Sequence, residues 1–211
     1  MKLTKFDHSC IVVEKDGLKI VCDPVEFTHH LPELDNVVAI IITHRHGDHL
    51  QPEKISAILD RNPEAQILTV ADAVEEFNQA TAVQAGDSLV LGGFQLEFFS
   101  KDHEAIVPGK TPCDNIGVVI DGMIVNPGDS FDLPEDITRP EVVLVSSAAP
   151  WCKMSESMAY IERAQAKIVL PVHNAVLSEF GNGVYNNWLR QACEPVGSEF
   201  APLASGESLD L

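Results

Sequence analysis

Residues 37–49 read Val-Val-Ala-Ile-Ile-Ile-Thr-His-Arg-His-Gly-Asp-His, and this stretch decides the fold. It opens with an apolar run, rich in β-branched side chains and too short for a typical buried helix, which predicts a strand buried on both faces. Four candidate metal-ligand side chains follow that run: His44, His46, Asp48 and His49. Imidazole and carboxylate groups are ligands of zinc and related divalent ions, and burying them together without a metal costs on the order of several kcal/mol. We therefore expect a metal site at the carboxyl end of this strand, rather than a group of solvated loop histidines.

The composition predicts one domain in an aqueous compartment. The chain has 211 residues, of which 45% are hydrophobic, and we expect a single domain spanning residues 1–211. A formal net charge of −18 and the lack of any basic run argue against nucleic-acid binding, which needs clustered Lys and Arg. No stretch approaches the roughly 18 consecutive apolar residues of a membrane span, and residues 1–7 lack the apolar segment of a signal peptide. Five cysteines without a Cys-x-x-Cys spacing fit reduced thiols, so we expect a cytoplasmic protein.

The order of predicted elements favours an α/β fold built from two sheets. Asp-Gly pairs at 16–17 and 121–122 each predict a hairpin between apolar runs. Helices are expected over residues 52–59, 72–80, 155–164 and 184–193, with Ser155 as the N-cap of the third. Strands are expected over residues 3–6, 10–14, 18–22, 37–42, 67–70, 94–99, 115–120, 123–125, 142–145 and 167–170. Hairpins come first and helix–strand alternation later, in two similar halves, which suggests two packed sheets with helices on their outer faces.

Three further residues are candidates to complete the site, because each lies a few positions beyond a predicted strand: His103, Asp129 and His173. Taken singly, each has an ordinary alternative, since a histidine after a strand is often a hydrogen-bonded loop residue and an aspartate after Pro-Gly is a common turn residue. Strand ends that share one sheet edge bring their loops together. We therefore expect all three to approach residues 44–49.

Four motifs follow one another along the chain: His-x-His-x-Asp-His at 44–49, His103, Gly-Asp at 128–129 and His173. This order resembles the ligand motif of the metallo-β-lactamase superfamily of dinuclear metallohydrolases. Three other segments resemble one branch of it, the small zinc-dependent hydrolases similar to L-ascorbate-6-phosphate lactonase: residues 1–10, Asp23-Pro24 and Pro127–Ser130. The chain departs from the glyoxalase II and true β-lactamase branches, because His103 stands in Lys-Asp-His-Glu-Ala rather than Gly-His-Thr. It is also too short for the added domain or exosite arm of RNA-processing members.

The resemblance implies an αββα four-layer sandwich of the metallo-β-lactamase type, with two mixed sheets and the metals at one edge. It further implies a ligand assignment: one metal on His44, His46 and His103, a second on Asp48, His49 and His173, and Asp129 bridging both. We expect two divalent ions, with Zn2+ as the first choice and Mn2+, Fe2+ or Ni2+ as alternatives that the same ligands suit.

The expected chemistry is hydrolysis by water that the metals activate. Two ions about 3.5–4 Å apart lower the pKa of a bridging water towards ~7, so that hydroxide attacks a carbonyl or phosphorus centre. Asp48 is the predicted catalytic residue, orienting the nucleophile or moving a proton, with a purely structural role as the alternative. His8 and Asp23 are predicted to hydrogen-bond to the ligands, because metal-bound imidazoles usually donate their free N–H to a carboxylate or carbonyl. The alternative for Asp23 is a turn aspartate before proline.

Other polar residues have weaker signals. His29 and His30 are expected in a solvated loop, with a pocket wall as the alternative. Trp151 and Lys153 follow a strand and are candidates to line the substrate pocket, against a core tryptophan or an exposed loop. Nothing in the sequence around Cys113 supports a nucleophile.

The sequence thus predicts a metal-dependent hydrolase that cleaves a small ester, lactone or phosphodiester, with a small-molecule substrate, no nucleic-acid or membrane partner, and an undetermined oligomeric state. The alternative is a metal-stabilised binding or sensor domain without turnover. Iron-based redox chemistry is a third hypothesis, disfavoured because such members usually carry a flavin domain that this length does not provide. Since ligand imidazoles must be neutral, metal affinity is expected to fall below about pH 6.5.

Overall fold

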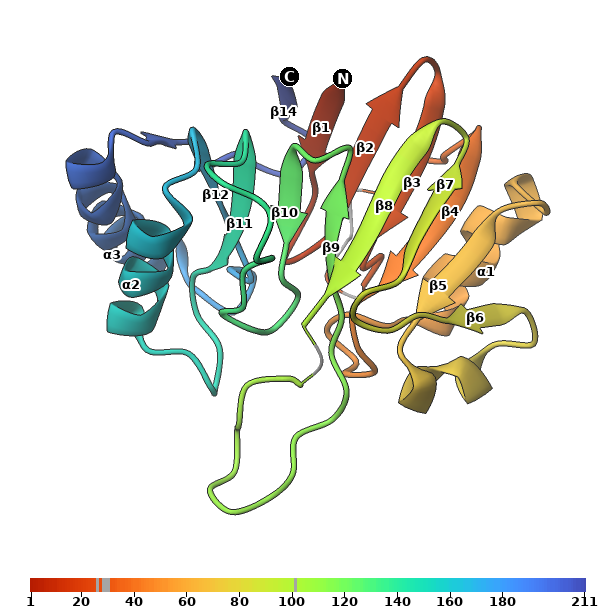
Figure 1. Ribbon diagram of the computed structural model, residues 1–211, viewed down its shortest axis with the longest axis horizontal. Coiled ribbons are helices and arrows are strands. Elements are labelled where there is room, and N and C mark those ends of the chain that lie inside the picture. Colours follow the sequence, from red (N-terminus) through yellow and green to blue (C-terminus); the bar gives the residue numbers. More distant parts are fainter. Residues whose placement is uncertain (26, 28–30, 101) are drawn as a thin grey trace.

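The computed structural model describes residues 1–25, 27, 31–100 and 102–211. Its α-helices are α1 (Pro52–Arg61), α2 (Met154–Ala164) and α3 (Glu179–Cys193). Two mixed sheets of seven strands lie between them, with α1 on one outer side and α2 with α3 on the other (Figure 1). The predicted α/β sandwich with helices on its outer faces is therefore confirmed.

The first sheet is built around the apolar run that opens the ligand stretch. Its strands, in spatial order, are β14 (Ser208–Asp210), β1 (Lys2–Lys5), β2 (Ile11–Lys15), β3 (Leu18–Cys22), β4 (Val37–Ile42), β5 (Gln66–Thr69) and β6 (Ala80–Ala82). The pairs from β14 to β3 are antiparallel, and those from β3 to β6 are parallel. Strand β4 lies inside the sheet and is almost fully buried, as its uninterrupted apolar sequence predicts.

The second sheet has the same mixed character. Its strands, in spatial order, are β13 (Glu199–Phe200), β12 (Ile168–Val172), β11 (Val142–Ser146), β10 (Ile124–Asn126), β9 (Gly117–Ile120), β8 (Phe94–Phe99) and β7 (Ser88–Leu91). The pairs from β13 to β10 are parallel, and those from β10 to β7 are antiparallel. Parallel strands place their carboxyl ends at one edge, so β10 and β12 direct the loops that follow them to the same place.

Two hydrophobic clusters hold the layers together. The larger one joins the two sheets and includes Ile40 and Ile42 of β4 together with Leu96 and Leu170 of the other sheet. The smaller one lies under α2 and α3 and includes fully buried Tyr160. Burying apolar area at about 25 cal/mol per Å² is the main stabilising contribution to such a core. The strand ends that carry the polar clusters therefore stand on a rigid frame.

Two helix predictions are wrong in detail. Residues 72–80 do not form a helix; a 3-10 helix covers Ala71–Glu76, and β6 follows, paired in parallel with β5. Pairing at this sheet edge outweighs the local helix propensity of the segment. Ser155 is not the N-cap of α2, because the helix starts one residue earlier and the N–H of its N-cap Lys153 donates to the Glu156 carboxylate at 2.9 Å.

The carboxyl-terminal part of the chain also differs from its prediction. Helix α3 begins at Glu179 rather than at Val184, and Ser178 caps it by accepting a hydrogen bond from the N–H of Gly181 at 3.1 Å. Glycines at 181 and 183 lower helix propensity, so the first turn gives little signal in sequence. Strands β13 and β14 are two and three residues long and went unpredicted. Among the described residues, no helix is both long and apolar enough to cross a membrane.

Candidate metal centre

Loops that follow five strands supply the polar side chains of one buried cluster. Asp23 follows β3, residues 43–49 follow β4, and His103, Asp129 and His173 follow β8, β10 and β12. Three overlapping groups have ligand atoms within 4.8 Å of one another: His44, His46 and His103; His44, His49 and Asp129; His8, Asp48, His49 and His173. The structure thus places all seven sequence-predicted ligands together. It also brings His8, from the loop after β1, next to Asp48, His49 and His173.

Asp129 lies at the centre of the cluster. Its Oδ2 is 3.3 Å from His103 Nε2 and 3.2 Å from His173 Nε2, and its Oδ1 is 3.2 Å from His49 Nε2. His44 Nε2 lies 3.9 Å from Oδ2. One carboxylate therefore faces imidazoles of both predicted ligand sets, which is the position a shared ligand requires.

The loop that carries Asp129 is fixed by backbone geometry. Gly128 has φ +62°, and a Cβ there would collide with Asn115 Oδ1 and lie 2.9 Å from Thr43 Cβ. The Asn115 side chain accepts a hydrogen bond from the N–H of Asp129 at 3.0 Å and donates to the carbonyl of Pro127 at 2.9 Å. Glycine is thus required at 128 for the turn and for the close approach of these neighbours.

Trp151 holds the same carboxylate from the side of α2. Its indole Nε1 donates to Asp129 Oδ2 at 2.8 Å, and its ring packs edge-on against Phe131 at 5.2 Å between centroids. The side chain is buried. Its burial agrees with the core tryptophan that the sequence offered as an alternative, but a single tryptophan after a strand gave no signal for the hydrogen bond to Asp129. Lys153 lies away from the cluster, exposed and paired with Glu156 at 3.6 Å.

Four histidines direct Nδ1 at oxygen atoms. His49 Nδ1 lies 2.8 Å from Asp23 Oδ2, His173 Nδ1 lies 2.7 Å from the carbonyl of Ala148, and His103 Nδ1 contacts the carbonyl of Glu104. His44 Nδ1 lies 3.1 Å from the hydroxyl of Thr43. Carboxylate and carbonyl oxygens only accept, and the Thr43 hydroxyl also accepts from His44 because its own proton is donated to Asp23. The proton of each neutral ring therefore resides on Nδ1, and Nε2 keeps its lone pair.

The Nε2 atoms of those four rings fit a metal. They are buried, and among the described residues none has a hydrogen-bond partner: His44, His49, His103 and His173. Unpaired buried polar atoms are costly, and a shared cation would satisfy all of them at once. Asp23 positions this arrangement, because it also accepts hydrogen bonds from the N–H and hydroxyl of Thr43, at 2.8 and 2.9 Å.

In His8, unlike the four histidines above, Nδ1 accepts a hydrogen bond instead of donating one. The N–H of Ala175 donates to its Nδ1 at 3.4 Å, so the proton of the neutral ring resides on Nε2, which lies 3.5 Å from Asp48 Oδ2. The carbonyl of His8 accepts a hydrogen bond from the N–H of His173 at 3.1 Å. His8, Asp23 and His173 all have positive φ, of 60°, 46° and 58°. Non-glycine residues are rare in this region, and such backbone strain clusters at functional sites.

Burial lowers the pKa of three histidines of the cluster. The pKa of His8 falls to about 4, and the pKa values of His44 and His46 also lie below the ordinary 6.5 because burial is reinforced by neighbouring imidazoles. These rings are uncharged at neutral pH. His46 is half-buried, and its Nε2 lies 3.6 Å from the thiol sulfur of Cys113.

The pKa values of two other histidines are raised. Burial alone would lower the pKa of His49 and of His173, but nearby carboxylates outweigh it, Asp129 and Asp23 for the first and Asp129 and Asp48 for the second. The pKa of His173 rises to about 9. Burial would raise the pKa of Asp48 and Asp129, yet the histidines outweigh it and hold both well below the ordinary range. Without a cation, protonated imidazoles balance these carboxylates.

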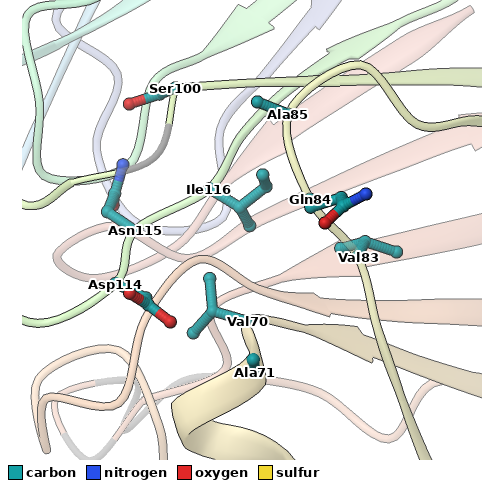
Figure 2. Close-up of a pocket in the computed structure, with 9 residues that line it drawn as sticks. All are labelled: Val70, Ala71, Val83, Gln84, Ala85, Ser100, Asp114, Asn115 and Ile116. Carbon is teal, nitrogen blue, oxygen red and sulfur yellow. The ribbon is translucent and has the colours of Figure 1, made fainter.

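A cavity of about 260 Å³ adjoins the cluster (Figure 2). Val70, Val83 and Ile116 form its apolar wall, and Ser100 and Asn115 lie toward another side. The ligand histidines do not line it; it shares with the cluster the Asn115 side chain that fixes the Asp129 loop. His29 and His30, predicted as a solvated loop or a pocket wall, lie outside the described residues.

The fold and the cluster define a protein class, a two-sheet sandwich with a histidine–aspartate centre at its edge. A family model for a β-lactamase superfamily domain matches residues 2–173. The chain is 28% identical over 191 residues to protein Rv0786c of Mycobacterium tuberculosis. The match covers 88% of this chain and 89% of that protein. It is also 28% identical over 171 residues to a UPF0173 metal-dependent hydrolase of Chelativorans sp., covering 69% and 72% of the two chains.

A solved structure agrees with these sequence matches. The metallo-β-lactamase fold protein YhfI of Bacillus subtilis is similar with a TM-score of 0.72 at 17% identity, covering 99% of this chain and 98% of that one. The chain belongs to the metallo-β-lactamase superfamily, in which it is a metal-dependent hydrolase. The narrower similarity to L-ascorbate-6-phosphate lactonase stays a prediction.

Proposed function

We propose that the cluster is a dinuclear metal site with which this chain hydrolyses a small ester, lactone or phosphodiester. The observation that carries the proposal is the position of Asp129, whose carboxylate oxygens lie 3.2–3.3 Å from Nε2 atoms of His103, His173 and His49. One carboxylate between two groups of imidazoles is the arrangement of a bridging ligand in two-metal hydrolases.

The ligands divide into two sets around Asp129. One ion would bind His44, His46 and His103, and the second Asp48, His49 and His173. All of these donors are nitrogen or oxygen, which suits Zn2+ first and Mn2+, Fe2+ or Ni2+ as alternatives. When bound, the two ions supply Lewis acidity, which strengthens water as an acid and stabilises charge that develops on an attacked carbonyl or phosphoryl group.

Asp48 is the residue that acts on the reacting atoms. Its side chain is 35% exposed, whereas those of the surrounding histidines His8 and His173 are almost fully buried, so it is the open side of the second ligand set. The two rings lie 3.5 and 3.4 Å from Asp48 Oδ2, and they outweigh burial and hold the pKa of Asp48 well below the ordinary range, so Asp48 is ionised. An ionised, partly exposed carboxylate can orient a water molecule by accepting a hydrogen bond from it.

His8 is a positioning residue for Asp48 rather than a ligand. Its Nδ1 accepts from Ala175, so its Nε2 donates and offers no lone pair to a cation. This donor faces Asp48 Oδ2 and leaves the other carboxylate oxygen for the metal. Asp23 does the equivalent for His49, whose Nδ1–H it accepts at 2.8 Å.

Metal content and turnover together test the proposal. Full-length protein should bind two equivalents of divalent ion and hydrolyse at least one member of a panel of lactones, aryl esters and phosphodiesters. His44→Ala and Asp129→Asn should abolish turnover, and Asp129→Asn should weaken both metal equivalents because it removes the shared charge. Asp16→Asn, in the turn between β2 and β3 and away from the cluster, is the matched control and should change neither.

Two outcomes would decide against the proposal. A folded protein that binds no divalent ion would refute the metal site. Two bound equivalents without turnover across the whole panel would instead favour a metal-stabilised binding or sensor domain.

A further inference from the structure

Helix α3 carries an apolar face that points away from the protein. Seven large apolar side chains are exposed among the described residues, and four of them lie four positions apart, at Val176, Phe180, Val184 and Trp188. Phe180 is 82% exposed and Trp188 is 47% exposed. A spacing of four residues places side chains on one face of a helix. Phe180, Val184 and Trp188 are called the α3 stripe below.

The stripe is separate from the face with which α3 joins the fold. Leu189, Ala192 and Cys193 are buried and belong to the cluster under α2 and α3. Helix α3 lies at the outer end of the molecule, on the side away from α1 (Figure 1). The surface around the stripe is hollowed, and the hollow is lined in part by Gly183. A large exposed apolar patch of this kind marks an interaction site in soluble proteins.

Charge decides which partner fits this face. Residues 174–189 carry one charged side chain, Glu179, in a chain whose formal net charge is −18. Two copies of the chain repel each other over most of their acidic surfaces. The repulsion is least where both copies present residues 174–189, because this segment carries only one charge. A basic partner would instead be drawn to the acidic faces.

The stripe and its flanking charges are also self-complementary. Val184 lies midway between Phe180 and Trp188 in sequence. Glu179 lies five positions before Val184, and Arg190 lies six positions after it, with its guanidinium 5.2 Å from the Phe200 ring centroid. If two copies of α3 pack antiparallel about a twofold axis at Val184, Phe180 meets Trp188 of the partner subunit. The same rotation brings Glu179 next to Arg190 of the partner subunit, twice over. Gly183 has nothing within 4 Å of a built Cβ, so the second helix can approach closely beside the axis.

We propose that this chain forms a twofold-symmetric dimer through the α3 stripe, with α3 helices antiparallel about Val184. The inference does not depend on the metal site, so its failure would leave the proposed function untouched. The pairing buries an apolar core inside a rim of opposite charges, as protein–protein interfaces do.

Sedimentation velocity of the full chain between 1 and 100 µM tests the dimer. We expect a species of twice the 23.0 kDa of one chain, with a population that grows with concentration. Val184→Asp puts two carboxylates face to face at the axis and should raise the dissociation constant at least about tenfold. Val90→Asp is the matched control, because Val90 is 68% exposed on β7, and it should leave the dissociation constant unchanged.

A charge swap tests the orientation. Glu179→Arg alone and Arg190→Glu alone should each weaken the dimer by roughly three- to tenfold, and the double variant should restore it. A monomer at 100 µM would overturn the proposal, as would a dimer that Val184→Asp leaves intact. A dimer that the double charge swap fails to restore would overturn the antiparallel register.

Discussion

The indole Nε1 of Trp151 donates a hydrogen bond to Asp129 Oδ2 at 2.8 Å, at the centre of the histidine–aspartate cluster. Asp129 Oδ2 also faces three histidine Nε2 atoms, so the indole helps to decide how the carboxylate is turned toward them. The donor comes from the loop between β11 and α2, which supplies no predicted ligand. Residues that hydrogen-bond to a ligand, as Trp151 does to Asp129, therefore help to set the geometry of the site.

Replacing Trp151 by phenylalanine should lower metal affinity roughly 10- to 100-fold, the usual effect of removing a hydrogen bond from behind a ligand. Phenylalanine keeps an aromatic ring against Phe131 but removes the N–H that orients Asp129. Competition with a chromogenic chelator measures the affinity. The control is Trp188→Phe, at the other tryptophan of the chain, on the exposed face of α3. Equal affinities of the two variants would show that the indole does not orient Asp129.

His8 gives a prediction about tautomers. We expect long-range 1H–15N NMR spectra of the metal-loaded protein to show His8 protonated at Nε2, and His49 and His173 protonated at Nδ1. His8→Phe removes the donor to Asp48, so it should weaken the second metal equivalent roughly tenfold and leave the first unchanged. His8→Gln places an amide N–H near the former Nε2 and should recover part of the loss. A His8 ring with a metal on Nε2 would contradict the assignment.

Much of the site could be predicted from sequence because a buried strand that ends in histidines is a local signal. Strand β4 covers Val37–Ile42, as its apolar run predicted. In the other sheet, the parallel pairing of β11 with β12 sets the place of His173 beyond the carboxyl end of β12. The hydrogen bonds of Trp151 and the polarity of His8 could not be predicted, because each depends on the backbone of a distant loop. Ala175 and His8 are 167 residues apart in sequence, and no local sequence pattern indicates that they form a hydrogen bond.

Gly128→Ala should destabilise the metal-free protein by about 2–5 kcal/mol. Alanine at φ +62° costs about 1–2 kcal/mol, and the collision of its Cβ with Asn115 and Thr43 adds about 1–3 kcal/mol. Gly122→Ala is the matched control, because φ is +65° there and a Cβ meets nothing within 4 Å. Urea unfolding in a chelator gives both free energies. If the two variants lose the same free energy, the packing of Asn115 against residue 128 contributes nothing.

Metal binding should release protons at pH 7.5 from the second ligand set and none from His44 or His46 of the first. In the metal-free protein the pKa of His173 is about 9 and that of His49 is also raised, so both rings carry a proton that a cation must displace. His44 and His46 have lowered pKa values and are already neutral. The metal affinity of the second set should therefore rise with pH until about pH 9. The sequence alone predicted that metal affinity falls only below about pH 6.5.

Calorimetric titration in buffers of different ionisation enthalpy counts the protons released with each equivalent. We expect up to two protons with the equivalent that binds Asp48, His49 and His173. The His8→Phe variant is expected to release the same number, because His8 has a pKa of about 4 and is neutral in this range. Binding without proton release at pH 7.5 would contradict the raised pKa values, and with them the balance of protonated imidazoles against Asp129 and Asp48.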